Sequence, residues 1–357
     1  MSRNAGEGAM VDQSAAAATV VGGERIARPS IFKRALSRPE FGSLVGAIAV
    51  LVFFSWRADS FLTSRGMANV LDPSATLGIM AVAVALLMIG GEFDLSAGVM
   101  VGATGTMFAM LTVDAGLNIW LAMAITLAFA VLIGLFNGFM VLKTRLPSFI
   151  VTLGTLFMIL GANVGLTRLI TNTVIVSGVG EVSGFAFPFT IFASSPIGQF
   201  RITVLWWLVI TGLATWVLLR TRFGNWIFGV GGDADAARSV GVPVAFTKVT
   251  LFVYVSVSAW LVGMMNTFRL SSASVSTGIG QEFEFIIAAV IGGCLLTGGY
   301  GSAIGAAIGA LVFGMVRQGI VLSGWDSDWF FLFLGMMLLI AALINQIVRK
   351  KAEEARS

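Results

Sequence analysis

Long apolar runs dominate this chain, and they limit the folds that it can adopt. Ten of them follow one another, at roughly 41–56, 70–90, 95–112, 118–142, 149–167, 203–219, 249–268, 285–297, 301–322 and 329–348. A helix needs about 20 predominantly apolar residues to cross a bilayer. Only 11% of the residues are charged, whereas a soluble domain has about 25%. The sequence therefore predicts an all-α, polytopic membrane protein with about ten transmembrane helices.

The first, third and eighth of these segments are shorter than a bilayer requires. Each either extends beyond its apolar run or enters the membrane without crossing it. The polar break at 90–98 also allows an eight-span alternative, in which this stretch is re-entrant.

Basic residues in the loops predict the orientation of the chain. With ten spans and the N-terminus inside, Lys and Arg of the inner segments outnumber those of the outer segments by about three to one. This bias predicts a protein of the cell inner membrane with both termini in the cytoplasm. Residues 1–40 are polar and basic, so we expect a cytoplasmic tail and not a cleaved signal. Residues 349–357 are expected to form a second cytoplasmic tail.

Composition excludes several classes of catalytic site. The chain has no His and one Cys, which rules out His-ligated metal sites, Cys–His catalysis and intrachain disulfides. The phosphate-binding loop G-x-x-x-x-G-K-[ST] is absent, which argues against ATP hydrolysis by this chain. The basic residues lie next to apolar spans, which does not favour a nucleic-acid partner. We expect no catalytic residue, metal or cofactor.

One polar stretch stands out on the expected cytoplasmic side. Residues 231–241 read GGDADAARSVG, a short Ala-rich segment flanked by glycines. The segment is either a solvated connecting loop or a short helix that binds a soluble partner. The candidate contact residues are Gly232, Asp233, Ala236, Ala237, Arg238 and Gly241.

A second polar break, GGEFDLSAG at 90–98, places Asp94 and Ser96 between two apolar runs. A carboxylate at the centre of a bilayer costs about 2.5–3.5 kcal/mol, so Asp94 should face protein or water. The two side chains either cap the helix that begins near Leu95 or line a transport pathway.

Further polar side chains lie on or near the predicted spans. Four of them either line a pathway for a polar solute or pack between helices: Asn137, Thr152, Thr155 and Asn163. Two carboxylates precede the eighth run, either at a periplasmic mouth that contacts a solute or partner or in a solvated loop: Glu282 and Glu284. Glycines at 301, 305 and 309 recur every four residues, a pattern that lets two helices approach closely, for static packing or for sliding.

As a set, these motifs resemble the ribose-type ABC transporter permease family. The similarity covers about residues 40–348, in the same order: Gly90-Gly91-x-x-Asp94-Leu95-Ser96, Thr152-Leu153-Gly154-Thr155, Ala236-Ala237-Arg238-Ser239-x-Gly241, and the glycines at 292–293, 298–299 and 301. The chain departs from the family pattern at Glu92, where an uncharged residue is usual, and at Cys294, where Thr is common. Phe283 and Phe285 are bulkier than their usual counterparts.

The resemblance implies the membrane pore of an importer for a monosaccharide or polyol. Such permeases pair as homodimers in the membrane lipid, with a periplasmic sugar-binding protein outside and ATP-binding subunits inside. Residues 41–348 would form the transmembrane permease domain, and the helix near 234–241 its coupling helix. The residues also leave open a secondary, ion-coupled transporter of a small polar solute, and a membrane scaffold or receptor.

Overall fold

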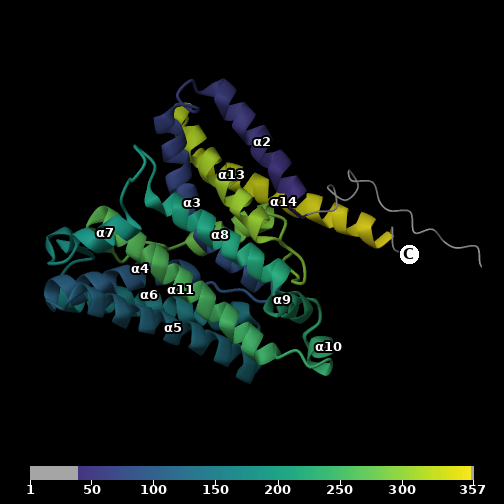
Figure 1. Cartoon of the computed structure of the whole chain (residues 1–357), viewed down its shortest axis with the longest axis horizontal. Helices are drawn as coiled ribbons and strands as arrows, with labels where there is room; N and C mark the ends of the chain where they lie inside the picture. The colour runs from purple at the N-terminus through teal and green to yellow at the C-terminus, as the bar shows by residue number, and fades with distance from the viewer. Residues whose placement is uncertain (1–38, 355–357) are drawn as a thin grey trace, which may run out of the picture. The chain divides into compact units, whose positions relative to one another are not determined.

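The described part of the chain is built almost entirely from helices (Figure 1). A computed structural model describes residues 39–354, with side chains from residue 40 to residue 343. The long helices are α2 (Pro39–Arg57), α3 (Ser64–Ile89), α5 (Ile119–Thr144), α6 (Ser148–Thr171), α8 (Ile202–Arg220), α11 (Val244–Leu270), α13 (Ala303–Leu322) and α14 (Trp329–Glu354).

Shorter elements connect the long helices. They are α4 (Ala97–Ala109) with its π-helical continuation η1 (Met110–Asp114), the 3₁₀ turn η2 (Val179–Glu181), α7 (Ala186–Phe192), α9 (Arg222–Gly232), α10 (Ala234–Ser239) and α12 (Gln281–Ile291). The strands β1 (Ile175–Ser177) and β2 (Ser272–Ser274) pair antiparallel, with Val176 opposite Ala273. The predicted all-α class is confirmed.

Each of the ten apolar segments contains a helix. Among the described residues, eight helical stretches are long and apolar enough to cross a membrane, and α4 with η1 forms one of them. The helix α12 has 11 residues, and the apolar part of α14 within the described side chains is Trp329–Leu343. The polytopic prediction is confirmed, whereas membrane crossing by α12 and α14 stays a prediction. Residues 1–38 and 355–357 of the two predicted tails lie outside the described residues.

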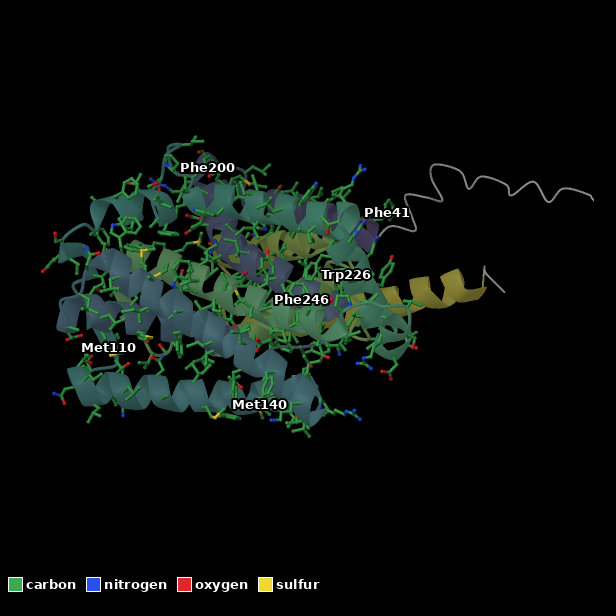
Figure 2. The ribbon with its side chains drawn as sticks, turned by 60° about the horizontal axis from the view of Figure 1, so that its bottom comes forward. Phe41, Met110, Met140, Phe200, Trp226 and Phe246 are labelled. Atoms are coloured by element: carbon green, nitrogen blue, oxygen red, sulfur yellow. The ribbon has the colours of Figure 1, made fainter. Side chains whose placement is uncertain are left out.

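The long helices run between two ends of the structure. Phe41, Trp226 and Phe246 lie at the end where α9 and α10 connect α8 to α11, which we call the α10 end (Figures 1 and 2). Met110 and Phe200 lie at the opposite end (Figure 2). That end also carries α7 and the two strands, and we call it the sheet end.

The helix α3 is the most enclosed of the long helices. Every residue from Leu77 to Gly90 is buried. By contrast, α5 and α6 expose large apolar side chains such as Leu132, Phe157 and Leu169, which suits helices that face lipid. Buried polar residues occur both on α3 and away from it, for example Ser74 on α3, Asn137 on α5 and Thr155 on α6.

Two glycines of the four-residue repeat lie directly against α12. A Cβ atom added at Gly305 would lie 2.0 Å from the carbonyl oxygen of Gly292, and one at Gly309 would lie 2.0 Å from that of Ala288. These separations are far below van der Waals contact, so a side chain at either position would push the helices apart. The repeat packs α13 on α12 within this chain.

Gly309→Ala is expected to destabilise the protein by about 1–3 kcal/mol, because the new methyl group overpacks the α12–α13 contact. Gly212→Ala on α8 is the matched control, since a Cβ there would meet open space. Thermal unfolding of the purified variants measures the difference. Equal melting temperatures for the two variants would show that α13 does not pack this closely on α12.

Candidate functional site

Four of the predicted pathway residues form one buried hydrogen-bond network. The Ser96 hydroxyl donates to Asp94 Oδ1 at 2.6 Å, and Asn137 Nδ2 donates to the Ser96 hydroxyl at 3.0 Å. The Thr155 hydroxyl then donates to Asn137 Oδ1 at 2.7 Å. All four residues are at most 1% exposed. The network thus joins the link between α3 and α4 to α5 and α6.

Asp94 also binds the backbone where α4 begins. Its Oδ1 accepts the Ser96 backbone N–H at 2.9 Å, while the Ser96 side chain makes no capping bond. Thr152 supports the same link, because its hydroxyl accepts the Leu95 N–H at 3.1 Å. Asp94 Oδ1 thus supports the loop before α4, whereas no side chain caps the helix itself and Asp94 Oδ2 is buried without a hydrogen-bond partner among the described residues.

Asn163 lies apart from this network. Its Oδ1 accepts a hydrogen bond from the Thr106 hydroxyl of α4. Asn163 and Thr155 both line a cavity of about 740 Å³ between α4 with η1, α5 and α6. Most of the other lining residues are apolar, among them Met107, Phe129 and Ile159. Such a lining offers few partners for the hydroxyl groups of a polar solute.

A second cavity, of about 500 Å³, is far more polar, and we call it the polar cavity. It lies between α3, α11, α12 and α13 and is lined by hydrogen-bonding side chains: Asn69, Asp72, Thr76, Asn266, Arg269, Thr277, Gln281, Glu284, Arg317 and Gln318. Gln281 and Glu284 begin α12, and Arg269 ends α11 beside the strands. The polar cavity therefore lies toward the sheet end.

Most of the polar cavity was not predicted from the sequence, although one signal of it was present. Asn69, Asp72 and Thr76 follow the i, i+3, i+7 spacing that places three polar side chains on one face of a helix. A polar stripe on an otherwise apolar span indicates that this face meets protein or water and not lipid.

Asp72 is the centre of an ion-pair cluster beside the polar cavity. Its Oδ2 lies 2.8 Å from Arg269 Nη1 of α11 and 3.3 Å from Arg201 Nε, which precedes α8. Its Oδ1 accepts a hydrogen bond from the Thr203 hydroxyl at 3.3 Å. One carboxylate thus ties three helices together at the sheet end. Because the side chains are only partly exposed, with values of 18%, 32% and 33%, solvent screens the cluster less than it screens a surface pair.

The two carboxylates predicted at a periplasmic mouth have different surroundings. Glu284 is half-buried and lines the polar cavity together with Arg317. Glu282 is 5% exposed and lies against α4, where a Cβ added at Gly98 would be 2.2 Å from Glu282 Oε2. Glu284 is therefore available to a solute in the cavity, whereas Glu282 packs α12 on α4.

The predicted partner-binding segment is a helix, α10, and not an irregular loop. Asp233 caps it, because Asp233 Oδ1 accepts the backbone N–H groups of Asp235 and Ala236, each at 2.9 Å. Gly241 ends it with a φ of 87°, a conformation that favours glycine. Arg238 is exposed and pairs with Asp235 at 2.6 Å. This geometry presents a short, charged helix at the α10 end.

The direction of Ala237 differs from that expected. Ala236 and Ala237 were both expected to contact a partner, but a helix turns about 100° per residue and points them to different sides. Ala236 and Gly232 are exposed, whereas Ala237 is 5% exposed and packs against Val230 and Val244. Ala237 holds α10 to the rest of the chain, whereas Ala236 and Arg238 are exposed.

Comparison with known proteins identifies the family. A family model described as "Branched-chain amino acid transport system / permease component" matches residues 66–342. The chain belongs to this permease family. It is 31% identical over 306 residues to the ribose import permease protein RbsC of Escherichia coli (strain K12), which covers 85% of this chain and 92% of that protein.

Two other similar proteins come from the same strain. The xylose transport system permease protein XylH is 29% identical over an alignment of 371 residues that covers 89% of this chain and 94% of XylH. The galactose/methyl galactoside import permease protein MglC is 30% identical over an alignment of 329 residues that covers 87% of this chain and 96% of MglC. No solved structure matches the chain.

These similarities confirm the predicted relationship to ribose-type ABC permeases. They favour a transmembrane permease subunit of a sugar importer over an ion-coupled transporter. The chain is thus a multi-pass membrane protein and a permease subunit, which is not itself an enzyme.

Thr155→Val is expected to destabilise the protein by about 1–3 kcal/mol, because it leaves the buried Asn137 amide oxygen without its donor. Thr215→Val is the matched control, since the Thr215 hydroxyl bonds only the carbonyl oxygen of Thr211 in its own helix. Thermal unfolding in the same detergent compares the two. A loss of stability no larger than that of the control would argue against the buried network.

Proposed function

We propose that this chain forms the membrane pathway of an ABC importer for a neutral monosaccharide or polyol, and that the solute passes through the polar cavity. The observation that carries the proposal is the lining of that cavity. Amide and hydroxyl groups of Asn69, Thr76, Asn266, Gln281 and Gln318 surround about 500 Å³, a volume within the range of small-molecule sites.

The charges of the polar cavity suit an uncharged solute. Two carboxylates, Asp72 and Glu284, are balanced by two guanidinium groups, Arg269 and Arg317. Asp72 is already paired with arginines, so the cavity offers no excess charge of one sign. A neutral, hydroxylated solute can exchange hydrogen bonds with the amides, while an ion would gain no net attraction. The similar proteins are named for xylose, ribose and galactose, which are solutes of this kind.

The two ends of the chain suit different partners. The α10 end carries Arg220, Arg222, Arg238 and Lys248, which favours a cytoplasmic location by the positive-inside rule. We place separate ATP-binding subunits there, in contact with Ala236 and Arg238 of α10, and a periplasmic sugar-binding protein at the sheet end. In this arrangement both termini are cytoplasmic. Residues 41–348 form the transmembrane permease domain. A second copy of the chain completes the pore in the membrane lipid.

The buried network of Asp94, Ser96, Asn137 and Thr155 has a supporting role in this proposal. Its side chains are enclosed, so they hold α4 in place beside the pathway and do not contact the solute. Thr152 is also enclosed, and Asn163 supports α4 through its hydrogen bond with Thr106, although it lines the apolar cavity. Glu284 is the member of the predicted set that faces the polar cavity.

Gln281→Ala and Asn266→Ala are expected to slow ATP-dependent uptake of the sugar by about 2–10-fold each, because each removes one hydrogen bond of about 0.5–1.5 kcal/mol to the solute. Uptake is measured in proteoliposomes that contain the complete transporter. Thr215→Val is the control, since the Thr215 hydroxyl bonds a carbonyl oxygen of its own helix and Thr215 lies outside the polar cavity.

Three results would contradict the proposal. One is uptake that does not need ATP but follows a proton or sodium gradient, as the ion-coupled alternative requires. Another is uptake of a branched-chain amino acid in place of the sugar. The third is a set of cavity variants that transport at the rate of the Thr215 control.

A further inference from the structure

A buried ion pair joins α11 to the link between α3 and α4. Lys248 Nζ of α11 binds Glu92 Oε1 of the link, and the two side chains are only 17% and 9% exposed. Lys248 lies one helical turn after Val244, the first residue of α11. A buried charge whose partner is removed is left uncompensated, so each side chain depends on the other.

The start of α11 is in turn attached to α10. Val230 of α9, Ala237 of α10 and Val244 of α11 form a small hydrophobic cluster of their own. The Val242 N–H also donates to the carbonyl oxygen of Ala237 at 3.0 Å. A displacement of α10 therefore moves the first turn of α11, and Lys248 with it.

The link that Glu92 belongs to is held on its other side by α6. The Phe93 N–H donates to the Ser148 hydroxyl at 3.0 Å, and the Leu95 N–H donates to the Thr152 hydroxyl at 3.1 Å. The link leads directly into α4, whose Gly98 lies against Glu282 and Gly278. Residues beside these two, Gln281 and Thr277, line the polar cavity.

We propose that Glu92 and Lys248 are positioning residues for transport, which transmit the movement of α10 through α4 to α12, a helix that lines the polar cavity. The inference rests on the proposed function, since it assumes that an ATP-binding partner moves α10. It goes beyond that function because it assigns the transmission to one side-chain contact between two segments.

A second contact attaches α9 to its neighbours, and it is made by backbone groups and not by charged side chains. The Gly299 N–H donates to the carbonyl oxygen of Ile89 at 2.8 Å, and a Cβ at Gly231 would lie 1.7 Å from that same oxygen. This junction brings backbone groups of α3, α9 and the α12–α13 link together without any side chain. This junction holds the α10 end together when the ion pair is broken. Loss of the pair should therefore uncouple sugar uptake from ATP hydrolysis without unfolding the protein.

The test measures sugar taken up per ATP hydrolysed by the complete transporter in proteoliposomes. Glu92→Gln and Lys248→Met should each lower this ratio about fivefold or more, the size of a modest coupling free energy. The reversed pair, Glu92→Lys with Lys248→Glu, should recover most of it, because the attraction is restored. Lys143→Met is the matched control, since Lys143 is exposed at the end of α5 and lies over the Phe139 ring.

The outcomes separate this inference from the proposed function. If the native transporter shows no ATP-dependent sugar uptake, the proposed function fails and this inference fails with it. If the native transporter works and Lys248→Met keeps its ratio, the inference alone is overturned. It is also overturned if the reversed pair assembles normally but is as uncoupled as the single variants, or if the variants lose only stability while the ratio stays unchanged.

Discussion

Buried backbone that is not helical needs hydrogen-bond partners, and this requirement organises the interior of the permease. The link at 90–96 runs between α3 and α4 without forming a helix, yet Glu92, Asp94, Leu95 and Ser96 within it are buried. Side chains of α6 accept two of its N–H groups, and Asp94 accepts a third. Each unsatisfied group would cost several kcal/mol in an apolar interior. Ser148 and Thr152 of α6 meet that requirement directly, whereas Asn137 and Thr155 bond to side chains.

Charged side chains on the membrane spans need partners in the same way as buried backbone groups do. Asp72 is acceptable on an apolar span because Arg201 and Arg269 converge on it from two other helices. The same residues border the polar cavity, so structural pairing and a hydrated, hydrogen-bonding surface occur together at the sheet end. Charged side chains within membrane spans are costly, so they pair with one another or face a water-filled cavity that a polar solute can enter.

Local patterns in the sequence predicted the local structure well. The apolar runs predicted the long helices, the polar break at 90–98 predicted the link between α3 and α4, and the Ala-rich segment predicted α10. Each of these elements depends mainly on residues that are close together in the sequence. The polar cavity depends on positions from Asn69 to Gln318, and no short-range pattern brings four helices together. The orientation of Ala237 was not predicted because it also depends on tertiary packing. Contact with Val230 and Val244 decides which side of this short helix faces inward.

The central claim is that a neutral sugar occupies the polar cavity during import, and labelling of a cysteine in the cavity tests it most directly. Cys294, the single native cysteine, is 1% exposed, so Asn266→Cys would supply the accessible thiol. In proteoliposomes of the complete transporter, a polar maleimide should label Cys at this position, and the transported sugar should slow the labelling. A thiol that does not react, or that reacts at the same rate with and without sugar, would contradict the account.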